Sequence, residues 1–374
     1  MRLIVTGGGT GGHIYPAVAV AKEMSHMLPR ASVLYVGTES GMESKLVPKE
    51  GLPFRSVRSS GVMGKSAGVA VKGLARAFMG VFDAMAILRE FRPDVVLGTG
   101  GYASGPVMAA SFVLGIPRAI QEQNAVPGKT NLWLSRISHM TFAAWDYSVK
   151  FFPDPSRVVV TGNPVRGAIF EDTPKEECRR FFGMSEEGPA VLILGGSRGA
   201  RTLVEAGMEM TKRMPREWSM LFVTGTEYYA EACRALGVSP GEGIDGVRAG
   251  NIILKPYVYE MSKAYGAADL VIGRAGGMTL AEITALGIPA VIVPSPNVAG
   301  NHQEYNARAL EEEGAAIVVR EGSNAASDVA EAAIGLLGDR ERLAELSGES
   351  RRIGKREATR VICRHLIDLA GRRR

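Results

Sequence analysis

Short apolar runs alternate along the chain with longer stretches in which apolar residues recur every three or four positions. Apolar runs bounded by glycine, proline or polar residues are typical of buried strands, and the periodic stretches predict helices. In the first half the pattern predicts strands near residues 2–6, 32–37, 53–57, 94–98, 117–121, 139–143 and 157–161. Helices are expected between them, near residues 14–27, 41–50, 67–91, 104–114 and 128–135.

The second half of the chain continues this alternation. Its strands are expected near residues 190–194, 219–223, 251–254, 269–272, 289–293 and 315–319. Its helices are expected near residues 200–213, 227–236, 259–266, 278–286, 302–313 and 325–337, with a terminal helix over about 350–369. Strands that alternate with helices in this way predict an α/β fold with parallel sheets.

A glycine-rich turn occurs twice, each time between an expected strand and an expected helix. The two turns are residues 7–13 (GGGTGGH) and 195–200 (GGSRGA). A second pair of segments, 94–101 (DVVLGTGG) and 269–277 (DLVIGRAGG), also matches, and Leu-Gly-Ile-Pro follows in both halves. Backbone N–H groups at such turns, with a helix dipole behind them, suit phosphate. The repeat predicts two similarly wound domains, each with an anion-binding turn.

A length of 374 residues fits two domains. We expect the first over residues 1–163 and the second over residues 164–349, with the segment 350–374 returning to the first. Ligands of such sheets bind at the carboxyl ends of the strands, so the active site is expected in the cleft between the domains. Hydrophobic residues make up 46% and charged residues 22% of the chain, which is typical of a soluble globular protein.

The net charge of +5 is unevenly distributed. Residues 1–165 carry 17 Lys and Arg against 10 Asp and Glu, residues 166–350 carry 18 against 27, and residues 351–374 carry 9 against 2. A basic first domain and tail suggest that they meet an anionic surface or ligand. Aromatic residues are only 7% of the chain and are not interleaved with basic runs, so no nucleic-acid partner is expected.

The three cysteines and the apolar segments bear on location. Cys178, Cys233 and Cys363 are far apart, which favours a reducing cytoplasm and no structural zinc. Too few apolar residues precede the first glycine for a signal peptide. Glycine and proline interrupt the uncharged stretch 95–117, so we expect a strand, a turn and a helix there rather than a transmembrane segment.

The first turn also fits a competing interpretation, a nicotinamide dehydrogenase. It satisfies G-x-G-x-x-G, and Glu39 follows the second strand. Glu39 lies 27 residues beyond Gly12, however, further than the usual spacing of about 20. His13 stands where a Walker A loop has lysine, which excludes that loop. Its imidazole could take a proton from an incoming hydroxyl or could only bond a carbonyl, and both alternatives stay open.

The second half offers a matching candidate in Glu282, just inside a helix that follows a glycine pair. A carboxylate there can accept hydrogen bonds from a ribose diol while Thr279 and the helix N–H groups hold a diphosphate; a helix-surface glutamate is the alternative. The polar loop 294–304 suits sugar hydroxyls. No Asp-x-Asp occurs in the chain, so we expect backbone dipoles and basic side chains to neutralise the diphosphate without a metal ion or other cofactor.

Six segments carry a family resemblance: 7–13 (GGGTGGH), 98–102 (GTGGY), 122–124 (EQN), 162–166 (GNPVR), 195–197 (GGS) and 274–282 (RAGGMTLAE). Together, over residues 1 to about 310, they resemble the MurG family of peripheral membrane N-acetylglucosaminyltransferases, which make lipid II for peptidoglycan. The resemblance implies a GT-B fold, two Rossmann-like doubly wound parallel-sheet domains facing a cleft. It implies transfer with inversion from UDP-N-acetylglucosamine, held by the second domain, to a polyprenyl-diphosphate-linked muramyl-pentapeptide, held by the first.

The resemblance also implies roles for individual residues. His13 becomes the favoured base for the acceptor's C4 hydroxyl, and Glu122 is the second candidate. Glu282 would bind the ribose, Ser197 and Thr279 the diphosphate, Val258 the uracil, and Asn124 and Gln303 the transferred sugar. Further donor contacts would be Thr10, Gly11, Gly12, Arg166, Gly277, Met278, Leu280 and Ala281. The acceptor's diphosphate would lie near Gly8, Gly9, Gly100, Gly101 and Tyr102.

Three positions depart from the family pattern. Gln121 stands where His often precedes Glu-Gln-Asn, Arg198 where Gln often follows Gly-Gly-Ser, and His302 where a second Gln precedes Gln303. All three residues are polar and could keep a hydrogen bond. The departures bear on individual contacts and leave the expected reaction unchanged.

A lipid acceptor requires contact with the anionic cytoplasmic face of a membrane. The helical pattern over 69–92 combines basic with apolar residues, and we expect a peripheral contact through Lys72, Leu74, Arg76, Phe78 and Val81. Packing of the apolar residues on the first sheet is the alternative. Other functions left open are a different UDP-sugar enzyme, such as a glycolipid transferase or an epimerase, the dehydrogenase, and a non-catalytic nucleotide-binding module.

Overall fold

The computed structural model describes residues 1–59, 67–196, 199–241, 243 and 245–371, apart from the side chains of residues 67–75 and 299. Contacts within the chain divide it into two compact units. The first is Met1–Gly167 together with Lys355–Arg374, and the second is Ala168–Gly354. The expected boundaries, after residues 163 and 349, lie a few residues before these divisions.

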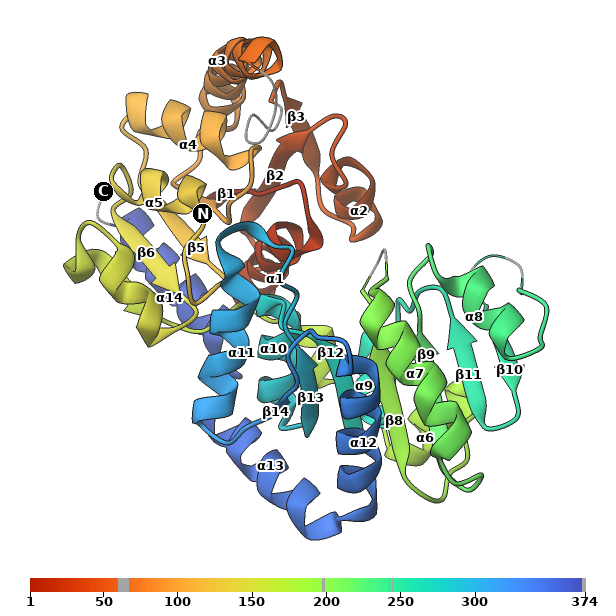
Figure 1. The fold of residues 1–374 in the computed structure, drawn as a ribbon. Helices are drawn as coiled ribbons and strands as arrows, with labels where there is room; N and C mark the ends of the chain where they lie inside the picture. The colour runs from red at the N-terminus through yellow and green to blue at the C-terminus, as the bar shows by residue number, and fades with distance from the viewer. Residues whose placement is uncertain (60–66, 197–198, 242, 244, 372–374) are drawn as a thin grey trace. The chain divides into compact units, whose positions relative to one another are not determined.

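The first unit is built on a sheet of seven parallel strands in the order β3-β2-β1-β4-β5-β6-β7 (Figure 1). The strands are β1 (Arg2–Thr6), β2 (Ser32–Thr38), β3 (Phe54–Val57), β4 (Val95–Gly98), β5 (Arg118–Glu122), β6 (Met140–Ala143) and β7 (Val158–Val160). The helices are α1 (Gly11–Met27), α2 (Glu43–Lys49), α3 (Ala67–Phe91), α4 (Ser104–Val113), α5 (Lys129–Ser135) and α14 (Ala358–Gly371), with the 3-10 turns η1 (Asp146–Phe151) and η2 (Pro155–Arg157). The order reverses between β1 and β4, which makes this the topological switch point.

Helices cover both faces of this sheet. Leu3 and Val5 of β1 are buried in a cluster with residues of α1 and α14, whereas Ile4 is buried in a second cluster with residues of α3 and α4. Successive side chains of a strand point to opposite faces, so a strand covered on both sides has to be apolar throughout. Burial of the sheet on both faces therefore explains the continuous apolar runs in the sequence.

The second unit repeats the architecture with the strand order β10-β11-β9-β8-β12-β13-β14. Its strands are β8 (Ala190–Leu194), β9 (Ser219–Val223), β10 (Val247–Ala249), β11 (Ile252–Lys255), β12 (Leu270–Arg274), β13 (Ala290–Val293) and β14 (Ile317–Val318). Its helices are α6 (Lys175–Phe182), α7 (Arg201–Arg213), α8 (Tyr229–Ala235), α9 (Met261–Ala267), α10 (Gly277–Leu286), α11 (His302–Glu312), α12 (Ala325–Gly338) and α13 (Arg340–Ile353), with the 3-10 turns η3 (Gly167–Phe170) and η4 (Ala299–Asn301). All pairings are parallel except that of β10 with β11. The predicted fold class, two parallel-sheet α/β domains, is confirmed.

The terminal helix expected over residues 350–369 is wrong as a single element. The structure has α13 and α14, which are separated by an extended Gly354 (φ −63°, ψ 133°). A Cβ atom at this position would lie 2.2 Å from the carbonyl oxygen of Thr284, so only glycine fits the contact. The break belongs to the tertiary packing, and it assigns α13 to the second unit and α14 to the first.

The sequence pattern also missed α6, β10 and α13. Helix α6 is held by Arg179, which is 4% exposed and donates to the carboxylate of Asp269 (2.8 Å) and to the carbonyl oxygen of Ala267 (3.2 Å). Arginine side chains are usually exposed to solvent, so the burial of Arg179 against Asp269 could not be predicted from the sequence. Helix α13 is polar over most of its length, so too few apolar residues mark its helical period in the sequence.

Candidate functional site

Three neighbouring strand ends form the candidate site of the first unit. β1, β4 and β5 are adjacent, and the turns 7–10, 99–103 and 123–128 follow their carboxyl ends. The first two turns meet backbone to backbone at one point, where a Cβ atom on Gly101 would lie 2.0 Å from the carbonyl oxygen of Gly8. Gly101 also has φ +77°, which favours glycine. The glycines that predicted an anion site therefore also serve close packing of the two turns.

His13 lies in the first turn of α1 with its ring half-buried between the other two strand ends. Its Nδ1 is 3.0 Å from the carbonyl oxygen of Thr99 and 3.0 Å from Oε1 of Gln123. The orientation of the Gln123 amide follows from its Nε2, which donates to the carbonyl oxygens of Thr99 and Gln121. Since both groups facing Nδ1 are acceptors, Nδ1 carries the proton in the neutral ring and the lone pair is on Nε2. This arrangement suits a general base.

A buried network of amides holds Gln123 in place. Nε2 of Gln121 donates to Oδ1 of Asn163 (2.8 Å), and Nδ2 of Asn163 donates to the carbonyl oxygen of Gln123 (3.0 Å). Nε2 of Gln123 in turn donates to Oε1 of Gln121. All three residues are at most 4% exposed. Gln121, one of the departures from the family pattern, thus keeps hydrogen bonds at its position.

Glu122, the alternative base, is 1% exposed and has both carboxylate oxygens engaged. Oε1 accepts from the backbone N–H (2.9 Å) and Nδ2 (3.2 Å) of Asn124. Oε2 accepts from the N–H of Gly128 (3.1 Å) and from Nδ2 of Asn131 (2.8 Å). Four donors converge on this buried carboxylate and order the turn. The geometry favours a structural role for Glu122, which orients Asn124.

The backbone N–H groups expected to bind the acceptor's diphosphate are partly used inside the unit. The N–H of Gly8 donates to the carbonyl oxygen of Gly100 (3.3 Å), and the N–H of Gly100 donates to Oγ of Ser104 (3.2 Å). That of Gly9 donates to Oε2 of Glu43 (3.2 Å). The ring of Tyr102 packs where a side chain on Gly9 would lie. Because these N–H groups already have acceptors, fewer of them are left for an external anion than the number of glycines suggests.

The start of α1 offers a different set of amides. Thr10 is the N-cap residue, and its side chain makes no capping hydrogen bond. Gly11 and Gly12 follow as the first two helical residues, where backbone N–H groups point out of the helix and the dipole favours a negative charge. Arg166 lies on the flank of the same helix, with its guanidinium 4.5 Å from the centre of the Tyr15 ring and 3.9 Å from a carboxylate oxygen of Glu50.

In the second unit, the candidate donor residues gather on α10. The helix follows β12, with Gly276 as N-cap and no side-chain cap, and it carries all six predicted residues from Gly277 to Glu282. Thr279 is half-buried in the first turn, whereas Leu280 is fully buried and faces the core. Ser197, assigned to the diphosphate, lies outside the described residues, as does Arg198.

Glu282 is 8% exposed, and its Oε2 accepts from the hydroxyl of Tyr265 (3.0 Å). Tyr265 is on α9, which follows the segment that contains Val258, itself 5% exposed. The hydrogen bond from Tyr265 orients the carboxylate of Glu282, which the sequence alone could equally have indicated to be an exposed helix residue. Sequence reasoning missed Tyr265, because a tyrosine in an apolar helix is typical of a core residue.

Two more polar residues lie at neighbouring strand ends of this unit. Gln303, at the start of α11, accepts from the backbone N–H of Ser295 through Oε1 (2.9 Å). Arg274, the last residue of β12, pairs with Glu321 (2.6 Å) and donates to the carbonyl oxygen of Val293 (3.2 Å). The guanidinium is only 20% exposed, so these partners fix it at the edge of the sheet that also carries α10.

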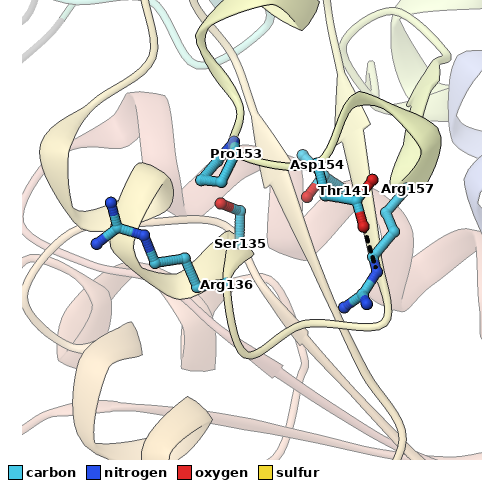
Figure 2. Close-up of a pocket in the computed structure, with 6 residues that line it drawn as sticks. All are labelled: Ser135, Arg136, Thr141, Pro153, Asp154 and Arg157. Carbon is cyan, nitrogen blue, oxygen red and sulfur yellow. Dashed lines mark ion pairs between the residues drawn. The ribbon is translucent and has the colours of Figure 1, made fainter.

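A hollow of about 180 Å³ in the first unit lies elsewhere (Figure 2). It is lined by Ser135, Arg136, Thr141, Pro153, Asp154 and Arg157. These residues come from the end of α5, the start of β6 and the segment before β7, so the hollow opens at the amino-terminal edge of the sheet. Asp154 and Arg157 are paired with each other (2.9 Å). Among the described residues, no group of His, Cys, Asp and Glu could hold a metal ion.

Comparisons with known proteins agree with this geometry. Residues 3–142 match the glycosyltransferase family 28 N-terminal domain, and residues 190–362 match its C-terminal domain. The chain is 40% identical over 374 residues, covering 100% of this chain and 99% of the relative, to the UDP-N-acetylglucosamine–N-acetylmuramyl-(pentapeptide) pyrophosphoryl-undecaprenol N-acetylglucosamine transferase of Desulforudis audaxviator. The chain belongs to glycosyltransferase family 28. A transferase of the same name from Bacillus cereus is 43% identical over 322 residues, 86% of each chain.

Solved structures of family 28 and of related folds extend the comparison. MurG of Acinetobacter baumannii superimposes with a TM-score of 0.73 at 28% identity and covers 98% of this chain and 99% of that chain. A UDP-GlcNAc 2-epimerase from Neisseria meningitidis, at 16% identity with a TM-score of 0.69, covers 98% of this chain and 100% of that chain and shares the fold alone. The resemblance to the MurG family and the expectation of a GT-B fold are confirmed.

The burial of Glu122 leads to a prediction about the stability of the first unit. Replacing Glu122 by Gln turns one acceptor into a donor, so at least one of its four donors is left unpaired, at a cost of about 1–3 kcal/mol in the free energy of unfolding. Denaturant unfolding followed by fluorescence of Trp133 and Trp145 measures it. Glu90→Gln, on an exposed glutamate of α3, is the matched control. Equal unfolding of the two variants would contradict the structural role.

Proposed function

We propose that this chain transfers N-acetylglucosamine from UDP-N-acetylglucosamine to the C4 hydroxyl of the N-acetylmuramyl residue of undecaprenyl-diphospho-muramyl-pentapeptide, lipid I, and so forms lipid II. The observation that carries the proposal is the 40% identity over the whole length of both chains to a transferase with this activity in its name. The half-buried His13, with its proton on Nδ1, supports it independently, because a glycosyl transfer to a hydroxyl needs a base.

We propose a single displacement for the chemistry. His13 takes the proton of the acceptor hydroxyl on Nε2 as the oxygen attacks the anomeric carbon, and the bond to UDP breaks on the opposite face. The α linkage of the donor becomes a β-1,4 linkage. Negative charge that develops on UDP is stabilised by the N–H groups at the start of α10 and by Thr279, which does not require a metal ion.

The remaining contacts are assigned by position. Glu282 accepts hydrogen bonds from the ribose and Val258 lies against the uracil, while Ser197 belongs with the diphosphate. Asn124 and Gln303 contact the transferred sugar. Thr10, Gly11 and Gly12 border it at the start of α1, with Arg166 on the flank of that helix. For the acceptor's diphosphate, Gly101 and Tyr102 remain candidates, whereas Gly8, Gly9 and Gly100 take part through packing.

We propose that the protein meets the membrane through α3. None of the helices that the structure describes has the length and apolar character that crossing a bilayer requires. Phe78 and Phe82 are 65% and 57% exposed, with ring centres 5.2 Å apart, and Arg76 is exposed on the same helix. Val81 packs against the core, so we leave it out of the surface. The side chains of Lys72 and Leu74 lie outside the described ones.

The reaction itself has a direct assay. UDP should be released from UDP-N-acetylglucosamine only with a lipid acceptor that carries the muramyl sugar, and label from the donor should enter the lipid product. A chelator should leave the rate unchanged, since backbone and side-chain dipoles neutralise the diphosphate. Equal UDP release with an acceptor that lacks the muramyl sugar would contradict the proposed transfer.

Removal of the base should affect turnover and not donor binding. His13→Ala should lower kcat about 10²- to 10⁴-fold, the range that general-base catalysis contributes, while the Kd for UDP stays unchanged. Steady-state kinetics and calorimetry measure the two quantities. His26→Ala, an exposed histidine of the same helix, is the matched control. An undiminished kcat in His13→Ala would remove this residue from the mechanism.

Loss of the ribose contact should weaken donor binding. Glu282→Ala should raise the Kd for UDP by about 10- to 100-fold, since a hydrogen bond to a charged group contributes about 1.5–3 kcal/mol. Tyr265→Phe should have a smaller effect of the same kind. UMP, which keeps the ribose, should lose as much affinity as UDP, whereas inorganic pyrophosphate should lose none. Normal affinity in Glu282→Ala would refute the ribose contact.

The membrane surface can be tested with one pair of variants. Phe78→Asp should reduce flotation with vesicles that contain anionic phospholipid, because it replaces an apolar contact by a charge of the same sign as the lipid. Phe181→Asp, on a 49% exposed phenylalanine of α6, is the control for charge and solubility. Equal flotation of the two variants would place the contact elsewhere.

A further inference from the structure

The chain carries a carboxylate of its own at the first glycine-rich turn. Glu43, the first residue of α2, is fully buried. Its Oε2 accepts from the backbone N–H of Gly9 (3.2 Å), and its Oε1 accepts from the N–H (3.0 Å) and the hydroxyl (2.6 Å) of Thr38. None of these three donors is a cationic side chain. Among the described residues, the donors to this carboxylate are two backbone N–H groups and one hydroxyl.

Three glycines make room for this carboxylate. A Cβ atom on Gly8 would lie 2.5 Å from Oε1 of Glu43, and one on Gly41 would lie 2.2 Å from the same atom. A Cβ atom on Gly37 would lie 2.6 Å from Cγ of Glu43. These close approaches come from three different segments: the glycine-rich turn, the strand β2 and the loop before α2. The space around Glu43 is therefore a fitted cradle.

A buried charge without a cation is costly, and only hydrogen bonds from fixed donors offset the loss of water. The N–H of Gly9 is such a donor. In dinucleotide-binding proteins, the backbone of this kind of turn faces a phosphate. In this chain the carboxylate of Glu43 accepts from the N–H of Gly9 instead, and a negative charge there opposes the approach of a second anion.

The described part of the duplicated turn in the second unit has different neighbours. The segment after β9, which corresponds to the segment after β2, has its acid at Glu227, and this residue is exposed. The ring of Tyr228, rather than a carboxylate, lies against Gly199, where a Cβ atom would be 2.4 Å from the ring. Among the described residues of this turn, no buried carboxylate takes a glycine N–H. The residue of the second turn that corresponds to Gly9 is Ser197, which lies outside the described residues.

We infer that Glu43 is a specificity residue: it fills the anion position at Gly9 and excludes nucleotide and inorganic diphosphates from the N–H of this residue. The duplicated fold would otherwise offer two similar sites to a nucleotide diphosphate. With Glu43 in place, the donor is directed to the second unit, and the first turn serves as a rigid support for His13. The inference goes beyond the proposed function and relies on it only for donor binding to the second unit.

Calorimetry on the full chain tests this inference. The protein is first saturated with UDP, whose binding is measured separately, and is then titrated with inorganic pyrophosphate. The wild type sets the baseline, which includes any pyrophosphate bound at the acceptor-diphosphate candidates Gly101 and Tyr102. Glu43→Ala, which removes the carboxylate together with the volume it fills and so frees the N–H of Gly9, should bind pyrophosphate at least about tenfold more tightly than the wild type. Glu39→Ala, at an exposed acid shortly before α2, removes the same charge and should behave as the wild type.

Three results would overturn the inference. One is a folded Glu43→Ala variant that gains no pyrophosphate binding, and another is an equal gain in Glu39→Ala, which would indicate a general effect of charge. The third comes from the wild type and does not depend on any variant folding. In an ¹⁵N-glycine spectrum with UDP present, a saturable shift of the assigned Gly9 amide on adding pyrophosphate would show that the position is open. Failure of UDP to bind would instead contradict the donor site.

Discussion

The first unit depends on a close backbone contact between the turns after β1 and β4, which is possible because both turns have glycine where they meet. The turns after β1 and β4 approach so closely that Gly8 and Gly101 meet through backbone atoms. Thr99 begins the second of these turns, and its hydroxyl donates to the carbonyl oxygen of His13 (2.6 Å) and lies 3.2 Å from that of Thr6. The same residue accepts from the His13 ring through its own carbonyl group. One short turn thus fixes both the backbone and the ring of the candidate base.

Several polar groups around this contact are buried and hydrogen-bonded to one another. The amides of Gln121, Gln123 and Asn163 form one network behind His13, and the carboxylates of Glu122 and Glu43 each hold a turn. Networks of this kind are rigid when every member has a partner and are costly when one is missing. In the second unit the hydroxyl of Tyr265 donates to Glu282 and orients its carboxylate. The two halves share a topology but orient their functional groups by different chemistry.

The sequence predicted the parallel strands and both glycine-rich turns, because these depend on local patterns of apolar residues and glycine. It missed Glu43 and Tyr265, whose roles arise from contacts between segments far apart in the chain. His13 was a candidate from its position after the turn. Its ring partners, Thr99 and Gln123, are 86 and 110 residues away, so the tautomer could not be inferred. Likewise, the break at Gly354 depends on a carbonyl group of another helix.

The state of the His13 ring is the most direct test of this account. ¹⁵N spectra of the histidine rings at about pH 8.5, where an ordinary imidazole is neutral, distinguish a protonated Nδ1 from a protonated Nε2, and a His13 variant assigns the signals. The account predicts the proton on Nδ1 and a free lone pair on Nε2, held by Thr99 and Gln123. A proton on Nε2 would mean that the ring faces the network differently and cannot accept the proton of an incoming hydroxyl as proposed.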